Sequence, residues 1–165
     1  MRFHEYVLQQ GNHFMAVEYY ALMLNRTFLV LVTPTHLVGV KVNELLSAEG
    51  GRDPFTRALT RAMAVQDKNN PYAYGRETYL KQVDELDLYG PEILGKSGGN
   101  FRLSYGDIAS VRHDPRSKWG MGPYPHDGKV YVTTKTGQKK ELILVGQQDG
   151  AAIAQAIQQK LWSQG

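Results

Sequence analysis

Residues 112–129 (RHDPRSKWGMGPYPHDGK) concentrate side chains that could bind a ligand. Arginine offers a two-pronged hydrogen-bonding group to phosphate or carboxylate, and an aromatic ring offers a stacking surface. We therefore expect an anionic ligand or a partner to contact this stretch. The candidate ligand or partner residues are Arg112, Arg116, Lys118, Trp119, Tyr124 and His126.

Two histidine–aspartate pairs at the ends of this stretch raise the question of a metal site. The four residues are His113, Asp114, His126 and Asp127. Two imidazoles and two carboxylates would suit zinc or manganese. No His-x-x-x-His spacing places them on one helix face, however, and Asp-Pro and Asp-Gly are ordinary turn sequences. We therefore predict no bound metal and no cofactor.

The same stretch has a second interpretation as a long surface connection between two strands. Its prolines would order the loop. Trp119 and Tyr124 would fold back over the mouth of a barrel, and the cations would stay solvated. Both interpretations remain open at the level of sequence.

Catalytic signatures are weak throughout the chain. The five histidines are scattered, and no serine lies in a nucleophile elbow. Asp84, Glu85 and Asp87 are expected on the solvated face of a helix, outside any shielded cleft. The glycines of residues 95–100 lack the spacing of a phosphate-binding loop. We predict that the protein is not an enzyme.

The composition is that of a globular protein. The chain has 165 residues, 42% of them hydrophobic and none of them cysteine, which favours a single domain over residues 1–165 and a reducing compartment. The N-terminus lacks the apolar core of a signal peptide, and charges interrupt the most apolar window. We expect a cytoplasmic protein. The net charge of +3 is too small for a typical nucleic-acid binder.

Short runs rich in valine, leucine, phenylalanine and tyrosine predict seven antiparallel strands. The run Phe28 to Val32 is apolar at every position, so we expect both of its faces to be covered. The alternative is an exposed edge that pairs between subunits. The predicted strands are residues 2–9, 14–24, 27–33, 36–43, 101–113 (kinked at Gly106), 128–135 and 138–146.

Residues 44–100 predict a helical insertion after the fourth of these strands. Asp53-Pro54 is a typical helix start, and the apolar spacing continues to about Val65. A second helix is expected over residues 75–90. The tyrosines near the insertion would either meet a partner or attach the helices to the barrel. The partner-surface candidates are Arg57, Arg61, Tyr72 and Tyr74.

A closing amphipathic helix follows Asp149, which is expected to cap it. Its apolar stripe is Ile153, Ala156, Ile157 and Leu161. Such a helix would plug the open end of a sheet that curls on itself.

Three segments carry a resemblance to a known family. They are TFLVLVTPTHLVGVKV (residues 27–42), LSYGDIASV (103–111) and GKVYVTTKTGQKKELILVGQQDGAAIAQAIQQKL (128–161). Together they resemble the pleckstrin-homology superfold, in particular its bacterial and GRAM-like branches. The resemblance implies an α+β, mainly β fold: a seven-stranded, partly open barrel with a C-terminal capping helix. The two-helix insertion between strands 4 and 5 departs from the family pattern.

Phosphoinositide-binding members of that superfold use basic residues around the loop that joins their first two strands. The corresponding connection here is GNH, residues 11–13, so phosphoinositide binding does not transfer. We expect a non-enzymatic binding or scaffolding module whose partner is a protein. One alternative is an anionic small molecule or lipid headgroup bound by residues 112–126. The other is an enzyme with its site between insertion and barrel.

Overall fold

A computed structural model of the chain describes residues 1–21, 24–44, 65, 67–118 and 125–164. The strands are β1 (His13–Ala21), β2 (Leu24–Val32), β3 (His36–Glu44), β4 (Phe101–Ser104), β5 (Ile108–Asp114), β6 (His126–Thr134) and β7 (Lys139–Val145). The α-helices are α2 (Glu77–Lys81), α3 (Glu92–Lys96) and α4 (Gly150–Trp162), and the 3-10 turns are η1 (Phe3–Glu5), η2 (Pro71–Tyr74) and η3 (Tyr105–Asp107).

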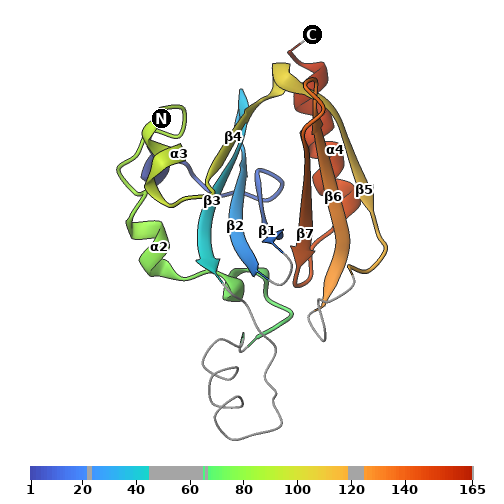
Figure 1. Cartoon of the computed structure of the whole chain (residues 1–165), viewed down its shortest axis with the longest axis horizontal. Coiled ribbons are helices and arrows are strands. Elements are labelled where there is room, and N and C mark those ends of the chain that lie inside the picture. Colours follow the sequence, from blue (N-terminus) through green and yellow to red (C-terminus); the bar gives the residue numbers. More distant parts are fainter. Residues whose placement is uncertain (22–23, 45–64, 66, 119–124, 165) are drawn as a thin grey trace, which may run out of the picture.

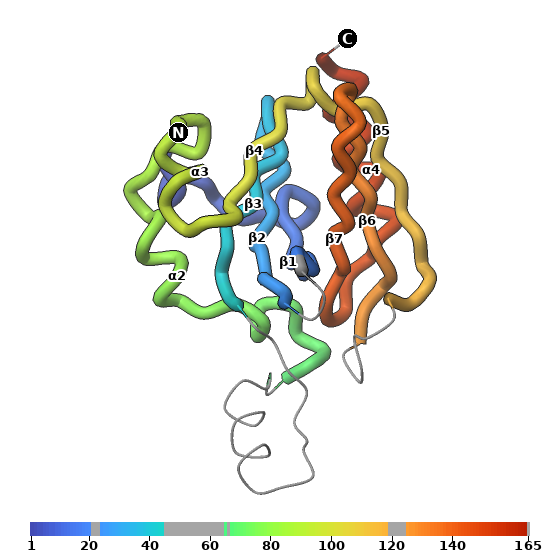
Figure 2. The backbone as a smooth tube through the Cα atoms, viewed as in Figure 1, coloured from blue at the N-terminus to red at the C-terminus, as the bar shows by residue number. Residues whose placement is uncertain are grey.

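The seven strands form one antiparallel sheet in the order β4-β3-β2-β1-β7-β6-β5. The sheet curls into a half-barrel, and α4 runs along it behind β6 and β7 (Figure 1). The two halves of the sheet meet where β1 pairs with β7, at Ala16↔Leu144 and Val17↔Ile143. Figure 2 shows the chain passing over the top of the half-barrel from β4 to β5.

The inner core lies between the concave face of the sheet and α4. Ala154 and Ile157 of α4 are buried in it, and Ile153 and Leu161 pack against it. Asp149 accepts a hydrogen bond from the Ala152 amide at 3.0 Å. The predicted cap and the predicted helix are therefore confirmed.

The outer core lies on the other face of β1, β2, β3 and β7. The N-terminal segment, Val65 and residues 67–93 cover this face, and their buried side chains in this core are Val65, Tyr74, Val83, Leu88 and Ile93. Because residues of β2 alternate between the inner and outer cores, every residue from Phe28 to Val32 is at most 5% exposed. The prediction of two covered faces is confirmed. The alternative of an exposed edge is wrong, since β2 lies between β1 and β3.

The first predicted strand, residues 2–9, is not a strand. Its backbone amides donate hydrogen bonds to the insertion and not to a neighbouring strand. The Phe3 amide donates to the Leu86 carbonyl and the His4 amide donates to the Asp84 carbonyl. The segment forms η1, and only Arg2 makes a bridge, with Asp87. Phe3 and Tyr6 of this segment pack against the outer core.

The predicted strand over residues 101–113 is two strands, β4 and β5, separated at η3. The hydroxyl of Ser104 accepts a hydrogen bond from the Gly106 amide and turns the chain there. The predicted total of seven strands is correct because two errors cancel: residues 2–9 form no strand, and residues 101–113 form two strands in place of one. By the observed numbering, the insertion lies between β3 and β4 and not between strands 4 and 5.

The helices of the insertion differ from the prediction. The predicted helix from Asp53 to Val65 lies outside the described residues except for its last residue. In the predicted helix over residues 75–90, only α2 is helical, and turns such as Leu86 amide to Val83 carbonyl follow it. Carbonyls that would extend the helix accept from the N-terminal segment instead. No helix in the described part is long and apolar enough to cross a membrane.

Candidate functional site

The outward side of β5, β6 and β7 carries a row of charged and aromatic side chains. The register places Arg112 of β5 opposite Tyr131 of β6, and Tyr131 opposite Glu141 of β7. Side chains directly opposite each other on neighbouring strands share a face and contact one another. We call this surface the basic face; its members on the strands are Arg112, Asp114, Lys129, Tyr131, Lys139 and Glu141.

Tyr131 is the centre of the basic face. The guanidinium carbon of Arg112 lies 4.4 Å from the ring centroid, and the Lys139 ammonium lies 4.1 Å from it. Lys129 is farther away, at 5.9 Å. The Tyr131 hydroxyl donates to Glu141 at 2.9 Å. Burial and this hydrogen bond raise the pKa of Tyr131. Cations are attracted to the negative face of an aromatic ring, so the Tyr131 ring keeps the Arg112 and Lys139 cations close together.

Two cations of the 112–118 segment are paired with carboxylates on this face. Arg116 donates to both oxygens of Asp114, and its Nη2 lies 2.8 Å from Asp114 Oδ2. These hydrogen bonds hold the pKa of Asp114 well below its usual range. Lys118 lies 2.6 Å from Glu141. Burial alone would raise the pKa of Glu141, but the hydrogen bonds from Lys118 and Tyr131 outweigh it and lower that pKa.

The structure thus brings together part of the predicted ligand stretch. Arg112, Arg116 and Lys118 all contact the same sheet face, whereas Trp119 and Tyr124 lie outside the described residues. The expectation that the loop cations stay solvated holds only in part: Arg116 is 80% exposed but paired, and Lys118 is paired and 32% exposed. On this face the cations Arg112, Arg116, Lys118, Lys129 and Lys139 outnumber the carboxylates Asp114 and Glu141.

Sequence reasoning missed Lys129, Tyr131, Lys139 and Glu141. Their signal is the alternation along residues 128–135 and 138–146, which places every second side chain on the outer face. The alternation alone does not show which residues stand opposite one another. That information requires the pairing of β5, β6 and β7.

The four candidate metal ligands do not converge. His113 Nε2 lies 2.7 Å from the carbonyl oxygen of Asp127, and the Asp127 carboxylate accepts from the Gly150 amide at 2.6 Å. This pair therefore ties the start of β6 to the start of α4. Asp114 is held by Arg116 on the basic face. His126 lines an open cavity of about 450 Å³ beside residues 146–149, where burial and Lys129 lower its pKa.

The two tyrosines of the predicted partner surface have different environments. Tyr74 is fully buried and its hydroxyl donates to the Lys68 carbonyl, so it belongs to the core and is not a surface residue. Tyr72 is 56% exposed, and its hydroxyl lies 2.6 Å from His13 Nε2. Burial lowers the pKa of His13. Both residues line a cavity of about 490 Å³ at the start of α4. Arg57 and Arg61 lie outside the described residues.

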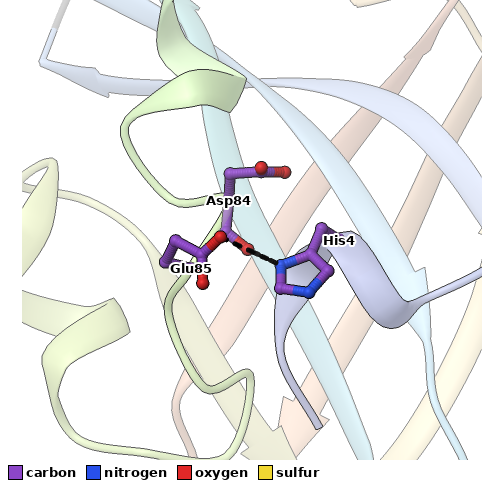
Figure 3. Close-up of side chains that lie close together, drawn as sticks. All are labelled: His4, Asp84 and Glu85. Carbon is purple, nitrogen blue, oxygen red and sulfur yellow. Dashed lines mark hydrogen bonds and ion pairs between the residues drawn. The ribbon is translucent and has the colours of Figure 1, made fainter.

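A further group of possible metal ligands consists of His4, Asp84 and Glu85, all exposed (Figure 3). His4 Nδ1 lies 2.9 Å from the Asp84 carbonyl oxygen and 3.6 Å from a Glu85 carboxylate oxygen. The other Glu85 oxygen accepts from Arg2 at 3.0 Å. These contacts attach the N-terminal segment to the insertion, and Arg2 already neutralises Glu85. The cluster therefore has a structural explanation without an ion.

Comparison with known proteins found no match among family models, curated sequences or solved structures.

Proposed function

We propose that this chain is a non-enzymatic binding module of the pleckstrin-homology-like class, and that its basic face binds an acidic segment of a protein partner. The order of seven antiparallel strands followed by a closing helix supports the class. The contacts of Tyr131 carry the proposed binding role: an aromatic ring lies among Arg112, Lys129 and Lys139, beside exposed sheet surface. Arginine and tyrosine dominate the binding energy of many protein interfaces.

The pairing of the loop cations favours a protein partner over a lipid headgroup or a small anion. A phosphate group needs cations that converge and are free to bind it. Arg116 and Lys118 instead each hold a carboxylate of the protein. What remains is a surplus of positive charge on Arg112, Lys129 and Lys139 around the Tyr131 ring. Such a surface suits an extended acidic peptide, whose carboxylates are spaced along the chain.

An enzyme with its site between insertion and barrel has no comparable support. The described contact between these parts combines the apolar outer core with single hydrogen bonds, such as that from Asn43 to the Tyr74 carbonyl. One cavity there, about 190 Å³, is lined by apolar residues together with Arg76, Glu77, Tyr72 and Gly75. The cavity of about 490 Å³ beside Tyr72 is lined by one histidine, His13, and one carboxylate, Asp149. A cluster of carboxylates and histidines shielded from water would be needed for acid–base catalysis.

A binding experiment with a labelled acidic peptide tests the proposal. The probe is a peptide of alternating glutamate and tyrosine, titrated with the wild-type protein and followed by fluorescence anisotropy. The double variant Arg112→Gln/Lys139→Gln should weaken binding by about tenfold or more. The matched control Lys96→Gln/Lys160→Gln removes the same charge from α3 and α4 and should leave binding unchanged. Binding should also weaken with added salt.

Two outcomes would overturn the proposal. Equal loss of binding in the control variant would mean that the peptide responds to net charge and not to the basic face. Binding to vesicles that contain anionic lipid, without binding to the peptide, would support the headgroup alternative instead.

A further inference from the structure

We infer that the open side of the half-barrel is a second binding site, which takes a small organic monoanion with an apolar body. This site is distinct from the basic face, although Lys139 borders both. It lies between β4 and the β6–β7 hairpin, which stand on either side of the opening in Figures 1 and 2. The cavity there measures about 360 Å³ and is lined by Glu18, Leu103, Val132, Thr134, Gln138, Lys139 and Lys140.

Three charged side chains meet at this opening. Glu18 of β1 accepts a hydrogen bond from Arg26 at 2.9 Å through one oxygen and from Lys140 at 2.7 Å through the other. Their side chains are only 13%, 22% and 21% exposed, respectively. The carboxylate neutralises one of the two cations, so the group retains a single positive charge in a partly desolvated place. Charges interact more strongly there than on an open surface.

Lys140 is the cation that faces the cavity. Its ammonium lies 4.3 Å from the ring centroid of Phe101, which packs edge-on against Phe28 at 5.2 Å. An ammonium has three N–H donors, and Glu18 takes one of them. The remaining donors can bind an incoming carboxylate above the aromatic pair. Lys139 also lines the cavity, but its ammonium lies over Tyr131 on the basic face.

The walls and size of the cavity specify the rest of the ligand. Leu103 and Val132 supply apolar surface, while Thr134 and Gln138 supply polar groups at the rim. Ligand cavities usually measure about 300–1,000 Å³, so this one suits a small molecule. A single retained positive charge matches one carboxylate better than a phosphate dianion. The chemistry therefore points to an aromatic or branched carboxylic acid.

A purely structural role for the three charges predicts a different behaviour. If Glu18 only closed the end of the barrel, its removal would lower stability and leave any affinity for anions unchanged. If the cavity binds a carboxylate, Glu18 competes with the ligand for Lys140. Replacing Glu18 with the isosteric neutral glutamine then frees the cation, and affinity for the anion rises.

The experiment is an NMR titration of ¹⁵N-labelled protein with 3-phenylpropanoate. Saturable shifts are expected at amides of β4, β6 and β7. Lys140→Met, which keeps the length of the side chain, should weaken binding by about tenfold or more. Glu18→Gln should strengthen binding severalfold. Lys135→Met removes the same charge from the exposed β6–β7 turn and should change nothing.

Two further probes test the ligand class. The neutral 3-phenylpropanamide should bind much more weakly than the acid, and inorganic phosphate should not produce the shifts. Equal binding of the amide, or no gain of affinity in Glu18→Gln, would overturn the inference. Phosphate binding at the same amides would overturn the requirement for an apolar body. Peptide binding at the basic face, measured on the same variants, keeps failure of this site distinguishable from failure of the proposed function.

Discussion

The exposed guanidinium of Arg116 holds the nearly buried carboxylate of Asp114, with Nη2 and Oδ2 at 2.8 Å. Asp114 is only 4% exposed, and the next cation, Lys129, lies 3.8 Å away. Because a buried carboxylate without partners is costly, this contact stabilises the end of β5 where the chain leaves the sheet.

Arg116→Ala should therefore destabilise the protein at neutral pH although Arg116 is a surface residue. The lowered pKa of Asp114 means that its contribution is present above the unfolded pKa, about 3.9, and is lost as the pH falls further. The difference in unfolding free energy between wild type and Arg116→Ala should thus shrink as the pH falls to about 3 and below. Denaturant unfolding at neutral and acid pH measures it. Arg116→Lys should restore part of the stability, and a difference independent of pH would contradict the prediction.

Gly39 of β3 should not tolerate a side chain. A Cβ at this position would fall within the ring of Phe101 on the neighbouring β4. Gly39→Ala is expected to cost about 1–3 kcal/mol of unfolding free energy, since the ring must move out of the inner core. Gly95→Ala is the matched control: nothing lies within 4 Å of its added Cβ. In α3 that change should be neutral or stabilising by up to about 1 kcal/mol. Equal effects of the two substitutions would contradict the packing argument.

Gln148 should stabilise the junction between the two halves of the sheet. Its side chain accepts from the Met15 amide at 2.9 Å and donates to the carbonyls of Met15 and Val145. Gln148→Ala leaves the Met15 amide without this partner and should cost about 1–3 kcal/mol. Hydrogen exchange of that amide should accelerate. The exposed neighbour Gln147 provides the control, and a Gln147→Ala variant with the same effect would refute the assignment.

Three histidines should make the protein less stable in mild acid. Burial lowers the pKa of His13, His36 and His126 below the ordinary value of 6.5. A lowered histidine pKa favours the neutral form in the folded state, so stability is complete above about pH 6.5 and falls as the pH drops through that value. Unfolding free energies at about pH 7.5 and about pH 5.5 measure the loss. A variant with asparagine at all three positions should show a smaller change of unfolding free energy between these pH values. An unchanged pH dependence would rule out the histidines as its cause.

Local sequence patterns predicted several elements correctly. The uninterrupted apolar run from Phe28 to Val32 indicated a strand buried on both faces, because burial of alternate residues on two sides requires apolar residues at every position. Asp149 before an amphipathic stretch indicated the start of α4, because the cap and the apolar spacing are both local properties. These features depend on neighbouring residues alone.

Patterns that depend on distant partners were misread. Residues 2–9 contain residue types that favour a strand, but Tyr6 donates to the carbonyls of Asn12 and Val32, and the segment packs outside the sheet. The expected helix over residues 75–90 is short because its carbonyls bind the N-terminal segment. A buried backbone group must find a hydrogen-bond partner, and the sequence near it does not show which distant group will be that partner.

By itself, the sequence determined the mainly β composition, the closing helix and the cluster of cations in residues 112–118. Only the tertiary structure decided how those cations are used. It placed Arg112 beside Tyr131, paired Lys118 with Glu141, and brought Glu18 and Lys140 together at the opening of the half-barrel. The physical reason is strand register: residues far apart in the chain become neighbours only when strands pair, and their charges interact only at that short range.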